Sequence, residues 1–80
     1  MGLQEHSMKA IIWSKPNCPY CVKAKAELTS RGIDYEERIL GIDWTKEQLL
    51  EMVPNARTVP QIFLDGTYVG GYNELMSYQT

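Results

Sequence analysis

Residues 15–21 read Lys-Pro-Asn-Cys-Pro-Tyr-Cys and contain both cysteines of the chain, Cys18 and Cys21. A short apolar run with β-branched residues at its centre precedes this stretch at 8–14, and it predicts a buried strand. A helical pattern follows from 19 to 31. Pro19 suits the first position of that helix, which makes Cys18 the expected N-cap. The two cysteines therefore stand where a strand passes into a helix.

The middle of the chain predicts a second strand and a second helix. The run at 33–40 is rich in charge, which is typical of an edge strand. Thr45 and Gln48 have the spacing of a capping box, so a helix should begin there and end at Pro54. This helix is expected to turn four apolar side chains inward: Leu49, Leu50, Met52 and Val53.

The last third of the chain predicts a hairpin and a short helix. Asp65-Gly66 separates two strand candidates at 61–64 and 67–70, which is the strongest short-range hairpin signal. A helix is expected from about Tyr72 to Tyr78. The order is therefore βαβαββα. A right-handed crossover makes the first two strands parallel, and the hairpin adds two antiparallel strands. We predict an α/β fold, a three-layer sandwich whose four-stranded mixed sheet is flanked by helices.

Chain length, net charge and the length of the apolar runs limit the class of protein. The chain has 80 residues and a formal net charge of −2, which predicts one domain and gives no electrostatic case for nucleic acid or a membrane. No apolar run approaches the length of a membrane span. Residues 1–7, which include the single histidine His6, are interpreted as a disordered leader or expression scar, and 8–80 as one domain. Without a secretory signal, we expect a cytoplasmic location.

The position of the cysteines favours redox chemistry. A thiolate on Cys18 would face unpaired amides and the positive end of the helix dipole, which favours the nucleophilic form. Cys21, one turn on, is close enough to form a disulfide and should be the more buried, resolving cysteine. A purely structural pair remains an alternative. A metal site is a weaker alternative, because zinc sites in proteins use three or four protein ligands and this chain contains two thiols and the single histidine His6. We therefore predict no metal.

Three motifs together carry a resemblance to a known family. CPYC at 18–21, RTVPQIFLDG at 57–66 and GGYNEL at 70–75 follow one another at spacings that resemble those of dithiol glutaredoxins. These belong to the thioredoxin-like superfamily, so the resemblance implies a thioredoxin-like fold. It covers nearly all of residues 8–78.

The resemblance also implies a glutathione site. Thr58, Val59 and Pro60, with a cis bond before the proline, would offer the Val59 backbone to the cysteinyl part of glutathione. Gly71, Tyr72 and Asn73 would hold the γ-glutamyl end, although Asn73 stands where relatives often have an acidic residue. Lys15 and Arg57 are candidates for the glycyl carboxylate. Tyr20 is expected to expose its ring beside Cys18.

The predicted function is a glutathione-dependent thiol–disulfide oxidoreductase that reduces protein disulfides and glutathione mixed disulfides through Cys18 and Cys21. Glutathione would be a co-substrate, with no tightly bound cofactor. The resemblance implies disulfide-containing or glutathionylated proteins as partners, ribonucleotide reductase among them, and a monomer. The alternatives are a thioredoxin-like electron carrier reduced by a flavin reductase, a dimer that binds an iron–sulfur cluster or another metal, and a non-catalytic interaction domain.

Overall fold

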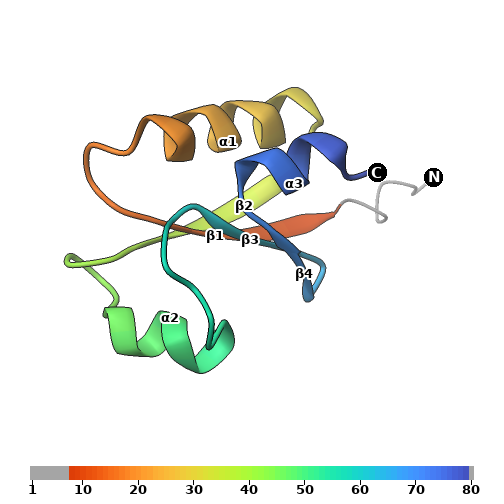
Figure 1. Ribbon diagram of the computed structural model, residues 1–80. Coiled ribbons are helices and arrows are strands. Elements are labelled where there is room, and N and C mark those ends of the chain that lie inside the picture. The colour runs from red at the N-terminus through yellow and green to blue at the C-terminus, as the bar shows by residue number, and fades with distance from the viewer. Residues whose placement is uncertain (1–7, 80) are drawn as a thin grey trace.

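The computed structural model describes residues 8–79, which form a four-stranded sheet and three helices (Figure 1). The elements in chain order are β1 (Lys9–Ser14), α1 (Pro19–Ser30), β2 (Asp34–Ile39), α2 (Lys46–Met52), β3 (Gln61–Leu64), β4 (Thr67–Gly70) and α3 (Tyr72–Ser77). This is the predicted order. The predicted leader at 1–7, with His6, lies outside the described residues.

The sheet has the strand order β2-β1-β3-β4. β1 pairs in parallel with β2, with Ile12 opposite Glu37, and antiparallel with β3, with Ile12 opposite Ile62. β2 is therefore the edge strand that its charge predicted. The mixed sheet and the parallel pairing of the first two strands are confirmed.

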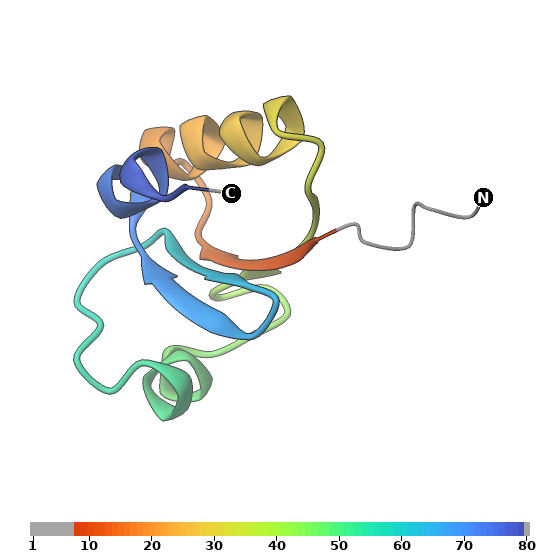
Figure 2. The ribbon, with the colours of Figure 1, turned by 90° about the vertical axis from the view of Figure 1, so that its right-hand side faces the viewer.

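Helices cover both faces of the sheet, which gives the three layers. α1 and α3 lie together on one face and α2 lies on the other, as the two views in Figures 1 and 2 show. Successive residues of a strand point to opposite faces. Ile12 accordingly packs under α1 and α3, while its neighbour Trp13 packs with Leu49 of α2 and with Val53, which caps the end of that helix.

The first helix forms as its sequence predicts. Pro19 occupies its first turn, and the stripe Cys21, Ala24 and Leu28 is buried against the sheet. Arg31 follows its last turn and donates to the backbone oxygens of Leu75 and Tyr78 at the end of α3. These hydrogen bonds join α1 to α3 on the same face of the sheet. The cysteines lie at the other end of α1.

The second helix begins with the predicted capping box, but not all of the side chains predicted to point inward are buried. Thr45 Oγ1 accepts from the Gln48 N–H at 3.1 Å, and Gln48 Oε1 accepts from the Thr45 N–H at 2.8 Å. Leu49 and Val53 are buried, but Met52 is exposed. The prediction for Met52 was wrong because the helix is short and only one of its faces meets the sheet.

The hairpin turn has the backbone that Asp65-Gly66 predicts. Both residues have positive φ, 49° and 83°, as a two-residue turn of this kind requires. Asp65 also accepts from the Lys9 N–H at 2.9 Å, which ties the turn to the start of β1.

Within residues 8–79, no helix has the length and apolar character that a membrane crossing demands.

Candidate active site

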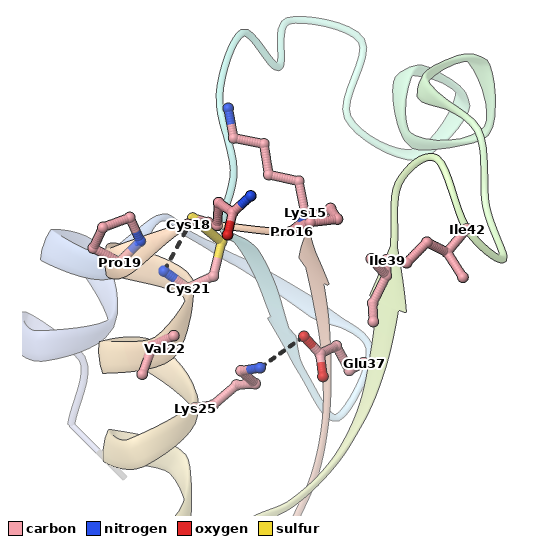
Figure 3. A pocket seen from close by; sticks show the side chains of 11 residues that line it. Lys15, Pro16, Cys18, Pro19, Cys21, Val22, Lys25, Glu37, Ile39 and Ile42 are labelled. Carbon is pink, nitrogen blue, oxygen red and sulfur yellow. Dashed lines mark hydrogen bonds and ion pairs between the residues drawn. A yellow bond between two sulfur atoms is a disulfide. The ribbon is translucent and has the colours of Figure 1, made fainter.

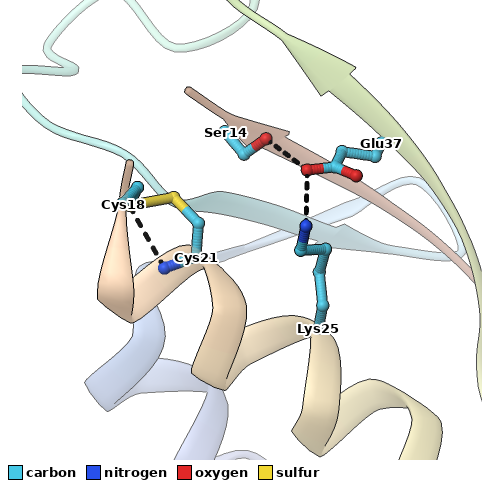
Figure 4. A network of polar contacts seen from close by, with 5 residues as sticks. All are labelled: Ser14, Cys18, Cys21, Lys25 and Glu37. Carbon is cyan, nitrogen blue, oxygen red and sulfur yellow. Dashed lines mark hydrogen bonds and ion pairs between the residues drawn. A yellow bond between two sulfur atoms is a disulfide. The ribbon is translucent and has the colours of Figure 1, made fainter. Parts of the chain in front are cut away.

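Cys18 is the N-cap of α1, as predicted. It is joined to Cys21 by a disulfide, and its sulfur accepts the Cys21 N–H at 3.2 Å (Figure 4). Cys18 is 8% exposed as a residue and Cys21 is 2% exposed. Cys18 is therefore the more accessible residue of the pair, and the helix-start amide that favours a thiolate is directed at its sulfur.

The loop before β3 brings the second motif to the sulfur. The Val59–Pro60 peptide bond is cis, as expected. The Val59 carbonyl oxygen lies 3.8 Å from the Cys18 sulfur. The Val59 N–H makes no hydrogen bond within residues 8–79. The backbone of Val59 therefore presents an unpaired donor beside the disulfide, where an extended peptide could pair with it.

A groove beside the disulfide collects most of the predicted binding residues. We call it the Val59 groove; it is lined by Tyr20, Thr58, Val59, Pro60, Gly71, Tyr72, Asn73 and Glu74, and its volume is about 310 Å³. Tyr20 exposes its ring, as predicted, and the ring packs against that of Tyr72 with centroids 5.6 Å apart. The start of α1, the loop before β3 and the start of α3 therefore meet in one place.

The two predicted cationic residues lie in an adjoining pocket. Lys15 and Arg57 line it together with Thr58 and Val59, which also line the Val59 groove. The ion pairs within residues 8–79 use Lys25, Arg31 and Arg38, so Lys15 and Arg57 make none there. Two positive charges in the pocket that adjoins the groove are thus available to an anionic group.

Sequence reasoning missed Glu74. It lines the Val59 groove next to Asn73, and its carboxylate accepts the Gly71 N–H at 2.9 Å. The groove therefore carries a negative charge one position after the residue where relatives often have one. The signal was present in the sequence, because a Glu three residues after a helix N-cap typically bonds back to the N-cap amide.

A second pocket opens beside the two cysteines (Figure 3). We call it the Glu37 pocket; it has a volume of about 670 Å³ and is lined by Lys15, Pro16, Asn17, Cys18, Pro19, Cys21, Val22, Lys25, Glu37, Ile39 and Ile42. In Figure 3 the Lys15 side chain extends away from Lys25 and Glu37. Sequence reasoning treated Glu37 only as edge-strand charge and so did not connect it with the cysteines.

Glu37 is held by two donors within this pocket. Ser14 Oγ donates to its Oε2 at 2.7 Å, and Lys25 Nζ donates to the same oxygen at 2.8 Å. Burial by itself would raise the Glu37 pKa, but the hydrogen bonds from Lys25 and Ser14 and the charge of Lys25 together lower it. The carboxylate is therefore ionised at neutral pH.

The structure contains no cluster suited to a metal ion in the part it describes. Within residues 8–79, no three His, Cys, Asp or Glu side chains come together as a candidate ligand set.

Comparison with known proteins decides the family. The family model described as glutaredoxin matches residues 10–69, which include both cysteines and all elements from α1 to β3. The chain belongs to the glutaredoxin family. Glutaredoxin 3 of Escherichia coli strain K12 is 42% identical over 66 residues, which cover 80% of this chain and 77% of that protein.

The chain is also similar to a longer protein and to solved glutaredoxin structures. The hybrid peroxiredoxin hyPrx5 of Haemophilus influenzae is 43% identical over 67 residues, which cover 84% of this chain but only 27% of that longer protein. The crystal structure of glutaredoxin 1 from Francisella tularensis, complexed with cacodylate, superposes with a TM-score of 0.76 at 31% identity and covers 89% of this chain and 91% of that one. A buckwheat glutaredoxin–glutathione complex superposes with a TM-score of 0.66 at 27% identity, covering 85% and 64% of the two chains.

The glutaredoxin fold and the cysteine pair together define the chemistry at a coarse level. The sheet and helices form the thioredoxin-like fold that was predicted. The C-x-x-C pair is a redox-active disulfide at the start of α1. This glutaredoxin is therefore a thiol–disulfide oxidoreductase.

Proposed function

We propose that this protein uses glutathione as its reductant and reduces protein disulfides and glutathione mixed disulfides. The observation that carries the proposal is the Val59 groove, whose Val59 carbonyl oxygen lies 3.8 Å from the Cys18 sulfur. The groove carries a negative charge, and the pocket that adjoins it at Thr58 and Val59 carries two positive ones. Lys15 and Arg57 supply the positive charges, and Glu74 supplies the negative one. Glutathione is a short peptide with carboxylates and an ammonium group, so it matches this order of charges.

The cysteinyl part of glutathione would bind in the middle of the groove. Its backbone would pair with the N–H and carbonyl of Val59 in the manner of an added strand. Because the Val59 oxygen lies 3.8 Å from the Cys18 sulfur, a cysteine paired there has its own sulfur within reach of Cys18.

The two ends of glutathione would meet opposite charges. The glycyl carboxylate would accept hydrogen bonds from Lys15 and Arg57. The γ-glutamyl ammonium would donate to Glu74 and to the side-chain oxygen of Asn73. Glu74 thereby supplies the charge that Asn73 lacks. Tyr20 and Tyr72 would cover the bound peptide with their paired rings.

The reaction follows thiol–disulfide exchange. The Cys18 thiolate attacks the glutathione sulfur of a mixed disulfide, the protein thiolate leaves and takes a proton, and glutathione is now joined to Cys18. A second glutathione thiolate then attacks the glutathione sulfur and leaves Cys18 reduced. With a protein disulfide, Cys21 attacks the mixed disulfide on Cys18, the substrate leaves as a dithiol, and two glutathione molecules restore the cysteine pair.

One variant separates these roles. Cys21→Ser, incubated with glutathione disulfide, should accumulate one glutathione on Cys18 by mass spectrometry and should keep its activity on glutathione mixed disulfides. Cys18→Ser is the matched control and should lose that activity. Loss of activity in Cys21→Ser, or an adduct on neither variant, would contradict the proposed roles.

Three narrower features remain predictions from the sequence. These are ribonucleotide reductase as a protein substrate, a monomeric state and a cytoplasmic location.

A further inference from the structure

The Glu37 pocket has no part in the binding of glutathione described above. It shares no lining residue with the Val59 groove, yet both cysteines line it. The Cys18 sulfur contacts the Val59 carbonyl at 3.8 Å, and Cys18 also borders the Glu37 pocket. A molecule bonded to Cys18 can therefore extend into either of two separate depressions.

The walls of this pocket are aliphatic and exposed. Val22 of α1 is 61% exposed, and Ile42, in the turn after β2, is 66% exposed. Figure 3 shows Val22 on one side of the pocket and Ile39 and Ile42 on the other. Six large apolar side chains are exposed within residues 8–79, and three of them line the pockets beside the cysteines: Tyr20, Val22 and Ile42. Exposed apolar surface thus gathers around the reactive disulfide, which is typical of an interaction site.

Both walls are held in place by backbone hydrogen bonds. The Val22 N–H donates to the Cys18 carbonyl at 3.1 Å in the first turn of α1. The turn that carries Ile42 closes on the Ile39 carbonyl, which accepts the N–H of Ile42 at 3.2 Å and that of Trp44 at 3.3 Å. The apolar walls are therefore formed before a partner binds, which lowers the entropy cost of binding.

The charged groups between the walls neutralise one another. Lys25 Nζ donates to Glu37 Oε2 at 2.8 Å, and Ser14 Oγ donates to the same oxygen at 2.7 Å. The third charged residue that lines the pocket, Lys15, extends away from this pair in Figure 3. Glutathione, with its charged ends, would meet a cation and a carboxylate that are already paired. An aliphatic side chain can instead pack against the walls without leaving a buried charge alone.

The pocket lies within reach of a chain that is bonded to Cys18. Val22 follows Cys18 by four positions, which is a rise of about 6 Å along the helix axis. An extended peptide advances about 3.3 Å per residue. A side chain one or two residues from the substrate's own cysteine therefore reaches the level of Val22.

We propose that the Glu37 pocket binds an aliphatic side chain that lies one or two residues from the reactive cysteine of a protein disulfide. The pocket thereby favours protein disulfides with an aliphatic neighbour over those with a polar one. The exchange is the one described above: the Cys18 thiolate bonds to one substrate sulfur, Cys21 then displaces that sulfur, and the substrate leaves with both sulfurs reduced. The inference rests on the proposed function for protein disulfides as substrates and adds a sequence preference to it.

The test uses synthetic peptides that are each closed by one disulfide. Leu is placed in turn at each of the two positions before and after either cysteine, and each Leu peptide is matched by a peptide with Asn at the same position. Reduced protein is mixed with each peptide and quenched in acid, and the Cys18–Cys21 disulfide is followed over time by mass spectrometry. The ratio of the Leu and Asn rates is divided by the same ratio for 2-mercaptoethanol, which corrects for the intrinsic reactivity of the peptides.

Wild-type protein should show a clear preference. Small differences in the size of an apolar group in a hydrophobic pocket change rates by about tenfold or more. Because this pocket is open on one side, we expect the low end, so at least one Leu peptide should react about tenfold faster than its Asn partner.

Two variants place a hydroxyl group on the walls. Val22→Thr and Ile42→Thr keep a β-branched side chain, and each should reduce the preference to about threefold or less. Both positions are exposed, so the fold should tolerate the changes. Met52→Gln, at an exposed apolar position of α2 outside the pocket, is the matched control and should keep the full preference. Each result is a ratio of rates for one variant, so a general loss of reactivity cancels.

The failures of the two proposals can be told apart. This assay contains no glutathione, so its outcome does not depend on the physiological reductant, whereas failure of the glutathione proposal appears as absent turnover with glutathione and glutathione reductase. Equal corrected rates for every Leu and Asn pair with wild-type protein would overturn the role of the pocket. A preference that both threonine variants retain, or that Met52→Gln also loses, would overturn it as well.

Discussion

The Val59 carbonyl oxygen lies 3.8 Å from the Cys18 sulfur, although 41 positions separate the two residues in the chain. Cys18 is fixed by the start of α1, and Val59 by the loop that enters β3. Because β1 and β3 are paired neighbours, the sheet itself brings these two segments together. A peptide paired with the Val59 backbone would lie beside the reactive sulfur, and the predictions about glutathione depend on this contact.

Glu74 should contribute to glutathione use through its charge. Glu74→Gln keeps an oxygen that can accept the Gly71 N–H and removes only the negative charge. A hydrogen bond to a charged group contributes about 1.5–3 kcal/mol, so the KM for glutathione should rise about tenfold or more while kcat stays similar. Steady-state kinetics with Glu47→Gln, an exposed acid of α2, as the control would check this. An unchanged KM would remove Glu74 from the site.

Arg57 should bind the opposite end. Arg57→Gln is expected to raise the KM for glutathione several-fold and to weaken its dependence on salt, because screening acts on the charge that the variant lacks. The measurement is KM at low and at high sodium chloride. Lys9→Gln, at the distant start of β1, serves as the control. A salt dependence equal to that of wild type would show that Arg57 does not meet the ligand's carboxylate.

Gly70 is required by the backbone at the entrance to α3. Its φ is +125°, and an added Cβ would lie 2.8 Å from the Cγ of Glu74. Gly70→Ala should therefore lower the free energy of unfolding by about 1–3 kcal/mol. Gly66→Ala also has positive φ, but an added Cβ there meets open space, so its loss should be smaller. Urea denaturation of both variants gives the comparison, and equal losses would contradict the steric argument.

The contacts of Glu37 with Ser14 and Lys25 should make the stability of the fold depend on pH in the acid range. Because the folded protein lowers the Glu37 pKa from its usual value of 4.5, the ionised form stabilises the fold above that pH, and the contribution is lost as the pH falls through the lowered value. The stability difference between wild type and Glu37→Gln should therefore be larger at pH about 7 than at about 3. Urea denaturation at the two pH values measures it. A stability difference that grew as the pH fell would contradict a stabilising role of the ionised Glu37.

Much of the fold could be predicted because local signals agreed with it. Pro19 after Cys18, the Thr45–Gln48 box and Asp65-Gly66 each determine a helix start or a turn within a few residues, and each is confirmed. Met52 could not be placed in this way, since which apolar residues of a short helix reach the sheet depends on the angle at which the helix packs.

The candidate site was only partly predictable for a related reason. The residues of the Val59 groove lie within short sequence motifs, so they could be predicted from the resemblance to glutaredoxins. Glu37 lies on a strand with no motif, and it lines the same pocket as the cysteines because β2 pairs in parallel with β1 and because Lys25 of α1 binds it. Such a relationship appears only when three elements are placed in space.

The central claim is that glutathione reduces the Cys18–Cys21 disulfide. The direct measurement follows NADPH consumption when the oxidised protein is supplied with glutathione and glutathione reductase, and in parallel with a flavin-dependent thioredoxin reductase alone. We predict sustained turnover in the first reaction and little in the second. Turnover with thioredoxin reductase and none with glutathione would contradict the account and identify the protein as a thioredoxin-like carrier.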